Sequence, residues 1–280
     1  MKTVRPKKFL GQHFLKDLGV ARAIADTVDA CPDLPVLEVG PGMGVLTQFL
    51  LPKERELKVV EIDFESVEYL RKHHPVLEDC IVEDDFLKMH LEHTFGGRSF
   101  VLTGNYPYNI SSQIFFKMLE YRELIPCCTG MIQKEVAERL AAAPGSKTYG
   151  ILTVLIGLWY DVEYLFTVEP GVFNPPPKVQ SAVIRLTRNG KKEAGCNEPL
   201  FRRIVKTAFN QRRKMLRGTL KPILAAAPAD EARQAQVTAF LQQPQLTKRP
   251  EQLSIQEFVD LTNEMETLLA PLPDVQYNNV

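Results

Sequence analysis

Short apolar runs alternate with amphipathic stretches over the first two thirds of the chain. Runs typical of buried strands lie at residues 35–39, 57–63, 80–82, 99–103 and 129–133. Stretches with helical spacing lie at residues 45–51, 64–73, 111–120 and 134–142. Strands that alternate with helices predict an α/β domain with a mostly parallel, doubly wound sheet. Two later strands, at 162–168 and 181–187, are expected to close that sheet as an antiparallel pair.

The last third of the chain has a different pattern. Residues 189–199 form a polar linker, and helical patterns follow at 200–220, 230–241 and 254–269. Ser254 and Glu257 have the spacing of a capping box at the start of the last helix. We therefore predict a Rossmann-like domain over residues 1–190 and a small all-helical domain over residues 191–280.

Composition limits the class of protein. The chain has 280 residues, of which 45% are hydrophobic, and this is enough for a sizeable core. The longest apolar stretch, residues 151–160, is too short to span a membrane. Five cysteines without a CxxC spacing argue against a disulfide framework and against a zinc site. We expect a cytoplasmic protein without a membrane partner or a bound metal.

Charge is distributed unevenly, although the formal net charge is zero. Residues 17–130 carry 10 basic and 19 acidic side chains, whereas residues 1–16 carry five basic side chains and no acidic one. Residues 199–229 carry eight basic side chains and again no acidic one. Such asymmetry predicts a polyanionic partner that is bound by basic patches.

A glycine-rich turn follows the first predicted strand. Glu38 begins the segment Glu-Val-Gly-Pro-Gly-Met-Gly, whose glycines Gly40, Gly42 and Gly44 lack the G-x-G-x-x-G spacing of dinucleotide sites. Such a turn allows a ligand to approach the backbone closely. Glu61, at the end of the second strand, suits a ribose diol because a carboxylate accepts from both hydroxyls. Asp63 is the alternative residue for that role.

Two further polar groups follow later strands. Asp84 and Asp85 come after the third strand, where a carboxylate can accept a hydrogen bond from an adenine amino group. The alternative is that these two residues form only a solvated acidic turn. Asn105-Tyr106-Pro107-Tyr108 follows the fourth strand. An asparagine oxygen and a backbone carbonyl before proline can each accept one N–H of an exocyclic amine and direct its lone pair, and an aromatic ring can stack on the base. The alternative is an Asn-Pro turn with a core tyrosine.

These residues, in this order, resemble class I S-adenosylmethionine-dependent methyltransferases, and specifically the KsgA family of rRNA adenine N6-dimethyltransferases. The resemblance covers residues 5 to about 260. Its motifs are KFLGQHFL (residues 8–15), EVGPGMGVLT (38–47), NYPYNIS (105–111), QKEV (133–136), YG (149–150), FNPPPKV (173–179) and NQRRK (210–214). The resemblance implies S-adenosylmethionine as cofactor, small-subunit rRNA in an assembling 30S particle as partner, and a monomeric protein that does not bind DNA.

The resemblance also implies roles for individual residues. Asn105 would bind the target N6, and the carbonyl of Tyr106 before Pro107 would be the second acceptor. Tyr108 and Phe173 would enclose a flipped adenine. The chain departs from the family at position 13, usually Asn or Asp, and at position 106, usually Leu or Ile. The cofactor-binding residues would be His13, Leu15, Gly40, Gly42, Glu61, Asp84, Asp85 and Asn105.

A basic stripe is predicted in the helical domain if residues 200–221 form one helix. Its basic residues, with the exception of Arg212, then fall within an arc of about 120°. Arg212 would serve a structural ion pair. A solvated face is the alternative, but like charges at this spacing repel one another. The predicted RNA-binding residues are Lys7, Lys8, Arg202, Arg203, Lys206, Arg213, Lys214, Arg217 and Lys221.

The expected reaction is the transfer of four methyl groups, two onto N6 of each of two adjacent adenosines in the 3′-terminal hairpin of the small-subunit (16S) rRNA. Three alternatives remain open. One is a large-subunit rRNA adenine dimethyltransferase of the macrolide-resistance type. Another is a DNA adenine methyltransferase, which usually carries Asp or Asn-Pro-Pro in the catalytic tetrapeptide. The third is a ribosome-assembly factor that acts mainly by binding.

Overall fold

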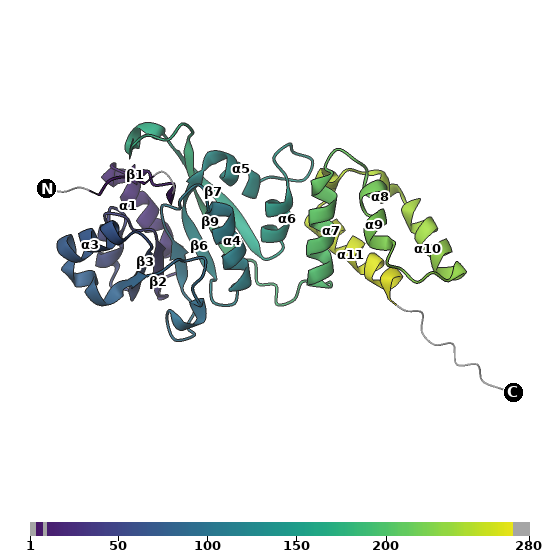
Figure 1. Ribbon diagram of the computed structural model, residues 1–280, viewed down its shortest axis with the longest axis horizontal. Coiled ribbons are helices and arrows are strands. Elements are labelled where there is room, and N and C mark those ends of the chain that lie inside the picture. Colours follow the sequence, from purple (N-terminus) through teal and green to yellow (C-terminus); the bar gives the residue numbers. More distant parts are fainter. Residues whose placement is uncertain (1–3, 8–9, 271–280) are drawn as a thin grey trace. The chain divides into compact units, whose positions relative to one another are not determined.

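The computed structural model describes residues 4–7 and 10–270. Its larger sheet has seven strands in the order β4-β3-β2-β5-β6-β9-β7 (Figure 1). Strands β2 to β6 are parallel, and β9 is antiparallel to both β6 and β7. This confirms the predicted doubly wound sheet with its antiparallel closing pair. The strands are β2 (Val36–Val39), β3 (Leu57–Glu61), β4 (Ile81–Glu83), β5 (Val101–Thr103), β6 (Cys127–Gln133), β7 (Tyr160–Val168) and β9 (Ser181–Arg188).

Helices connect the parallel strands. The predicted bounds of α3 and α4 agree with the structure. Helix α2 is shorter than the predicted range 45–51, and at its C-terminal end the chain tightens into a 3₁₀ turn at Leu51–Lys53. Helix α1 was not predicted. Asp17 caps it by accepting from the Val20 amide at 3.0 Å. The helices of this part are α1 (Leu18–Asp26), α2 (Thr47–Leu50), α3 (Phe64–His73), α4 (Ser111–Glu120) and α5 (Lys134–Leu140).

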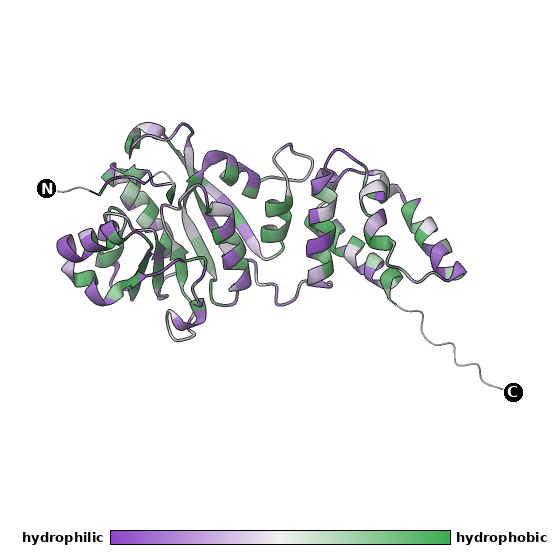
Figure 2. Cartoon of the chain, in the orientation of Figure 1, coloured by the Kyte–Doolittle hydropathy of each residue, from purple (hydrophilic) through white to green (hydrophobic). Residues whose placement is uncertain are grey.

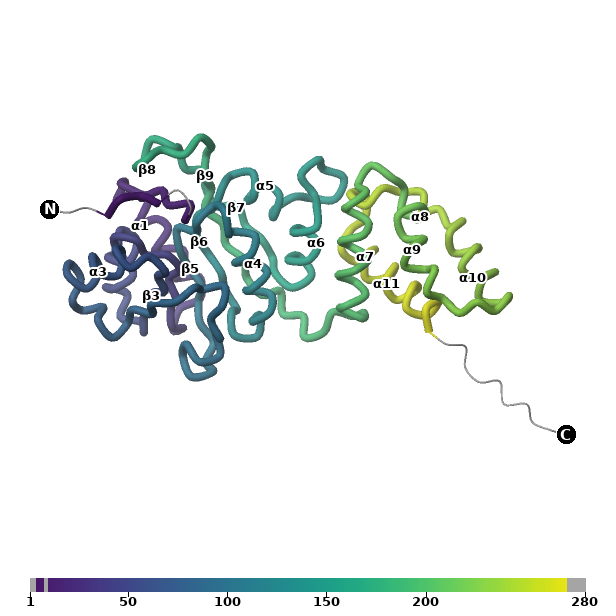
Figure 3. The backbone as a smooth tube through the Cα atoms, in the orientation of Figure 1, coloured from purple at the N-terminus to yellow at the C-terminus, as the bar shows by residue number. Residues whose placement is uncertain are grey.

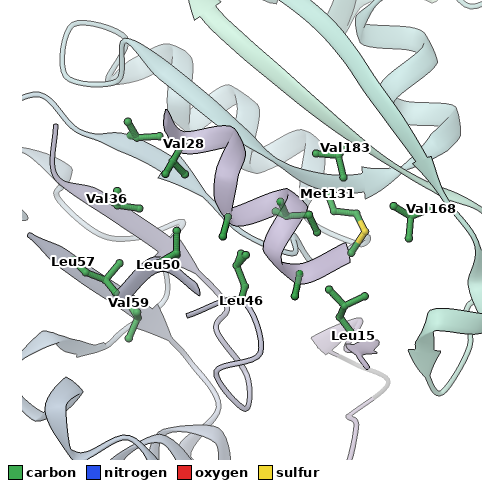
Figure 4. Close-up of a cluster of buried hydrophobic side chains, with 14 of the residues drawn as sticks. Leu15, Val28, Val36, Leu46, Leu50, Leu57, Val59, Met131, Val168 and Val183 are labelled. Carbon is green, nitrogen blue, oxygen red and sulfur yellow. The ribbon is translucent and has the colours of Figure 1, made fainter. Parts of the chain in front are cut away.

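The apolar core lies between the sheet and α1. All four residues of β2 are buried, as expected for a central parallel strand, and hydrophobic residues are concentrated in the sheet (Figure 2). Figure 4 shows Val28, Val36, Leu57 and Val183, from segments far apart in the sequence, within one cluster. Burial of these side chains provides the main stabilisation of the sheet.

The register of the parallel strands aligns their carboxyl ends. Val39 of β2 pairs with Val60 of β3, and Glu61 of β3 pairs with Glu83 of β4. On the other side of β2, Glu38 pairs with Thr103 of β5. The four turns that leave these strands therefore meet at one edge of the sheet, where open α/β sheets bind ligands.

The N-terminal segment is attached to this part by a small sheet that the sequence did not predict. Strand β1 (Phe14–Leu15) pairs antiparallel with β8 (Phe173–Asn174), so the two segments lie side by side (Figure 3). The Lys16 amide also donates to the Val172 carbonyl at 2.8 Å. A short segment far from β8 in sequence is thus held in place by backbone hydrogen bonds.

The described residues form two compact units, and the second contains residues 142–158 as well as residues 191–270. The predicted boundary, which assigned all of 1–190 to the first domain, is therefore wrong for residues 142–158. The apolar stretch within them forms α6, which packs on α7. The helices of the second unit are α6 (Ile151–Gly157), α7 (Glu198–Asn210), α8 (Leu216–Thr219), α9 (Lys221–Leu224), α10 (Glu231–Leu241) and α11 (Ile255–Leu269).

The predicted single helix over residues 200–221 is also wrong. Helix α7 ends at Asn210, and the chain turns before α8 begins at Leu216. Residues 210–214 are all polar, so no apolar side chain continues the buried face of α7 through this segment. The predicted capping box is confirmed: the Ser254 hydroxyl accepts from the Glu257 amide at 3.2 Å, and the Glu257 carboxylate accepts from the Ser254 amide at 2.7 Å.

Among residues 4–7 and 10–270, no helix combines the length and the apolar character that a membrane crossing requires.

Candidate cofactor and catalytic site

A cavity of about 230 Å³ opens where the four turns meet. Its wall is completed by residues 10–15 of the N-terminal segment and by Ile24 of α1. All lining residues belong to the first unit. The lining includes the following predicted site residues: His13, Leu15, Gly40, Gly42, Glu61, Asp84, Asp85, Asn105, Tyr106, Pro107 and Tyr108.

The glycine-rich turn approaches the cavity through its backbone. Gly40 and Gly42 have φ values of 68° and 56°, which side chains rarely permit. A Cβ atom at Gly42 would lie 3.0 Å from the ring of Phe14. The turn can therefore present its backbone to a ligand only with glycine at these positions.

The Glu61 carboxylate lines the cavity in a fixed orientation. Its oxygens accept from the amides of Gly42 at 3.1 Å, Ile62 at 3.0 Å and Asp63 at 2.9 Å. Burial raises the pKa of Glu61 above its usual range, although these three N–H groups favour the ionised form. The carboxylate is thus fixed at the wall of the cavity before any ligand binds.

Asp63, the alternative to Glu61, has a structural role instead. It caps α3 by accepting from the Glu65 amide at 3.2 Å, and it binds Lys7 at 2.5 Å and Gln12 at 3.1 Å. Burial alone would raise the pKa of Asp63, but the hydrogen bonds from Lys7 and Gln12 lower it below the usual value. Asp63 does not line the cavity.

Asp84 and Asp85 follow β4, the strand next to β3, and also line the cavity. Asp85 accepts from the Leu87 amide at 3.0 Å and pairs with Lys88 at 3.2 Å, whereas Asp84 is exposed and accepts from the Asp85 amide at 2.7 Å. Ile62 also lines this part of the cavity and is 57% exposed. Ile62 was not among the predicted site residues, and the sequence signal that could have found it is an apolar residue directly after a carboxylate at a strand end.

The amide of Asn105 has a defined orientation. Its Nδ2 donates to the His13 carbonyl at 3.1 Å, so its Oδ1 is the remaining acceptor of the side chain. The backbone of Asn105 bridges to Met131 of β6, and the Tyr106 amide donates to the Met131 carbonyl at 3.0 Å. The N-terminal segment and β6 together fix this turn.

Tyr108 lines the cavity, but Phe173 does not. The Phe173 side chain is 1% exposed and packs in the apolar core, because its pairing opposite Leu15 turns it away from the solvent side of β8. The structure therefore does not place Phe173 beside Tyr108 at the cavity. The ring beside Tyr108 is His13, stacked with a centroid distance of 5.4 Å and an interplanar angle of 29°. The His13 Nδ1 also lies 2.9 Å from the Pro175 carbonyl oxygen.

Buried Glu38 lies beneath the cavity. It is 1% exposed and accepts from the Thr47 hydroxyl at 2.7 Å. Burial raises the pKa of Glu38 to about 8, and the nearby negative charge of Glu61 raises it further, whereas the Thr47 hydrogen bond opposes the shift. The site therefore contains a carboxyl group that can gain or lose a proton near neutral pH.

The predicted basic residues differ in their environment. Lys7 is bound by Asp63 and lies 3.2 Å from Glu65, so its charge is balanced within the first unit. Arg202 pairs with Glu198 at 2.7 Å. Lys8 lies outside the described residues. Six exposed basic residues within residues 203–221 form no ion pair with any described residue: Arg203, Lys206, Arg213, Lys214, Arg217 and Lys221.

Arg212 has the structural role that its position suggested. Its guanidinium donates to the Ser146 carbonyl at 3.1 Å and lies 3.7 Å from the Glu251 carboxylate, all within the second unit. Among the described parts of the chain, no group of His, Cys, Asp and Glu side chains is placed to hold a metal ion.

A parallel sheet with a glycine-rich turn, acidic residues at three successive strand ends and an Asn-x-Pro-Tyr turn after the fourth defines a Rossmann-like class I methyltransferase. The chain belongs to the ribosomal RNA adenine dimethylase family, whose model matches residues 4–265. Enzymes of this class use S-adenosylmethionine. The cavity fits that cofactor through Glu61 and Asp84, through its apolar wall at Ile62, and through a glycine turn open to close approach.

Two relatives are similar to this chain over nearly their whole lengths. The "Ribosomal RNA small subunit methyltransferase A" of Phocaeicola vulgatus is 66% identical, over 100% of this chain and 96% of the relative. The protein of the same name from Bacteroides thetaiotaomicron is 68% identical, over 96% of this chain and 97% of the relative.

Solved structures show the same fold. A dimethyladenosine transferase from Plasmodium falciparum has a TM-score of 0.74 and 28% identity, over 91% of this chain and 98% of that one. The 23S rRNA methyltransferase ErmE has a TM-score of 0.61, also with 28% identity, over 89% of this chain and 99% of that one.

Glu38→Gln should reduce the loss of stability at rising pH. The pKa of Glu38 is raised to about 8 in the folded state, above its ordinary value of 4.5. The contribution of this carboxyl group to the free energy of unfolding is therefore fully present below pH 4.5 and is lost as pH rises through about 8. One such proton contributes at most about 1.4 kcal/mol per pH unit to the free energy of unfolding. Urea unfolding at pH 5 to 8.5 measures the slope, with exposed Glu54→Gln as control. Parallel curves for wild type and Glu38→Gln would contradict the assignment.

Glu61→Gln should weaken binding of S-adenosylmethionine about tenfold to a hundredfold. The variant replaces a charged acceptor with a neutral one, and a hydrogen bond to a charged group contributes about 1.5–3 kcal/mol. Calorimetric titration gives the affinity, and Glu68→Gln, an exposed acid on α3, is the matched control. Equal affinities for the two variants would exclude Glu61 from the cofactor site.

Proposed function

We propose that this chain dimethylates N6 of two adjacent adenosines in the 3′-terminal hairpin of small-subunit (16S) rRNA, with S-adenosylmethionine as methyl donor. The observation that carries the proposal is the position of the Asn105–Tyr108 turn on the same cavity as Glu61 and the glycine-rich turn. Groups suited to a cofactor and groups suited to an adenine amine therefore share one space.

In the proposed chemistry the residues of the chain position the two reactants, and the methylated nitrogen loses one N–H proton to solvent. Bound S-adenosylmethionine supplies a methyl group on a positively charged sulfur. The Asn105 Oδ1 and the Tyr106 carbonyl each accept one N–H of the target amine, which directs the nitrogen lone pair away from the adenine ring. Pro107 limits the freedom of the turn, and Tyr108 offers a face on which the base can stack. Alignment of this kind contributes a large part of the rate in two-substrate reactions.

The amide of Asn105 is arranged for this role. Because its Nδ2 donates to the His13 carbonyl, its oxygen rather than its nitrogen is available to the substrate. After the first transfer the amine keeps one N–H, so one of the two acceptors then has no donor from the substrate. The second methylation thus depends on a single hydrogen bond and on stacking.

The choice of the small-subunit rRNA is supported by the relatives. Both relatives described above, at 66% and 68% identity, carry the small subunit in their names, whereas the 23S rRNA enzyme ErmE is 28% identical. Primer extension on small-subunit and large-subunit rRNA after incubation with the protein tests this choice. Stops only on the large-subunit rRNA would favour the macrolide-resistance type.

The second unit offers a surface for RNA phosphates. Six basic side chains within residues 203–221 are exposed and unpaired among the described residues, and the segment holds no acidic residue. This surface replaces the single-helix stripe, since its residues come from α7, the following turn, α8 and α9. Phosphate contacts of this kind would provide affinity without base specificity.

The natural substrate is proposed to be the rRNA within an assembling 30S particle in the cytoplasm, bound by a monomer. Binding to the particle can also serve assembly itself, so the catalytic and assembly roles are compatible. Light scattering of the free protein tests the monomer, and methylation of immature particles against naked rRNA tests the substrate.

Asn105→Ala should leave cofactor and rRNA affinities within a few-fold of wild type and should lower the single-turnover rate about 10²–10³-fold. The reason is that its hydrogen bond strengthens as the nitrogen becomes tetrahedral, as for other groups that act in the transition state. Mass-spectrometric counting of N6,N6-dimethyladenosine measures the product. The variant Asn105→Asp keeps a side-chain oxygen that can accept from the target amine, but it loses the Nδ2 hydrogen bond to the His13 carbonyl. A rate for Asn105→Ala close to wild type would refute the proposed role.

Changing Arg203, Lys206, Arg213 and Arg217 together to Gln should weaken rRNA binding and flatten its salt dependence. Each lost phosphate contact should reduce the log–log slope by about 0.7–0.9. The control carries the same charge change at four exposed positions outside this segment: Arg22, Lys72, Lys192 and Arg249. If both variants have the wild-type slope, the segment is only a solvated face.

A further inference from the structure

The side chain of Tyr106 fills an enclosed space beneath the cavity. It is 1% exposed, and the space exists because two neighbouring residues are glycines. A Cβ atom at Gly130 would lie 2.7 Å from Cε2 of the Tyr106 ring and 2.4 Å from the Gly104 carbonyl oxygen. A Cβ atom at Gly104 would lie 2.5 Å from the Val39 carbonyl oxygen. The ring thus lies where β5 and β6 approach each other without side chains between them.

Both ends of Tyr106 are attached to β6. Its hydroxyl donates to the Thr129 carbonyl at 2.8 Å and lies 3.4 Å from the Cys128 sulfur. Its backbone amide donates to the Met131 carbonyl at 3.0 Å. In return, the Met131 amide donates to the Gly104 carbonyl, also at 3.0 Å. The ring therefore acts as a rigid connection between the substrate-facing turn and the middle of β6.

We propose that the Tyr106 side chain is a positioning residue for methyl transfer. Its ring and hydroxyl hold the 105–106 peptide against β6, and this sets the direction of the Asn105 side chain and of the Tyr106 carbonyl. The inference rests on the proposed function, in which these two groups bind the adenine amine. Tyr106 acts through its neighbours, since its own ring is enclosed.

The tyrosine and the glycine at position 130 are matched to each other. Leucine or isoleucine at position 106 would lack both the outer part of the ring and the hydroxyl. Gly130 contributes no side chain that could fill the resulting void, and its φ of 144° disfavours any other residue. In this chain, the position of the turn therefore depends on the tyrosine in particular.

Tyr106→Phe tests the proposal, because it keeps the ring and removes only the hydroxyl. Tyr160→Phe is the matched control. Tyr160 is also 1% exposed, and its hydroxyl donates to the Ile125 carbonyl at 2.8 Å, but it does not line the cavity. Both variants lose a buried hydrogen bond of 2.8 Å to a backbone carbonyl, and Tyr106→Phe also loses the longer contact with the Cys128 sulfur, so their melting temperatures should fall by similar amounts.

The single-turnover rate should separate the two variants. A misplacement of about 1 Å costs about 10²-fold in rate, so the smaller shift after loss of one anchor should cost about tenfold in Tyr106→Phe. The KM values for S-adenosylmethionine and for rRNA should stay within about twofold of wild type. Tyr160→Phe should retain the wild-type rate. Tyr106→Leu, which also loses the ring, should be slower than Tyr106→Phe at a temperature where both are folded.

Equal rates for Tyr106→Phe, Tyr160→Phe and wild type would overturn the positioning role, as would a raised KM for the cofactor with an unchanged rate constant. Asn105→Ala in the same assay distinguishes this failure from failure of the proposed function. If Asn105→Ala is inactive while Tyr106→Phe is normal, only the positioning role is refuted. If Asn105→Ala is fully active, the proposed function of the turn is refuted as well.

Discussion

The site depends on the parallel register of β2, β3, β4 and β5. Because Val39 pairs with Val60 and Glu61 pairs with Glu83, the polar groups that end these strands lie at one level of the sheet. A shift of one residue would turn Glu61 into the core and would separate it from the Gly42 amide. The buried apolar faces of the strands hold this register, so the hydrophobic core and the cofactor cavity are consequences of the same pairing.

Much of this arrangement could be predicted from the sequence because the relevant signals are local. Apolar runs that end in Glu61, in Asp84 or before Asn105 mark strand ends, and the alternation with helices places those ends together. The choice between Glu61 and Asp63 could not be made in this way. It depends on Lys7 and Gln12, which reach Asp63 from a segment far away in the sequence.

The departures from the sequence predictions have different physical causes. Phe173 is buried because β8 pairs with β1, and neither strand is long enough to produce a pattern in the sequence. Residues 142–158 join the second unit through contacts such as that of Arg212 with the Ser146 carbonyl, which local periodicity does not encode. The basic segment was predicted as one helix because the charge pattern was given more weight than the lack of apolar residues over positions 210–214. The exposed positive charges themselves remain, on several short elements.

The pairing of β1 with β8 also has a consequence for synthesis. Residues 10–15 leave the ribosome early, yet the strand that holds them, Phe173–Asn174, is translated about 160 residues later. At the slower translation rates of about 5 residues per second, this delay is on the order of half a minute. A nascent chain therefore has the acidic and glycine-rich parts of the cavity well before it has the complete wall. Premature termination anywhere before β8 would produce a chain whose N-terminal segment lacks its pairing with β8.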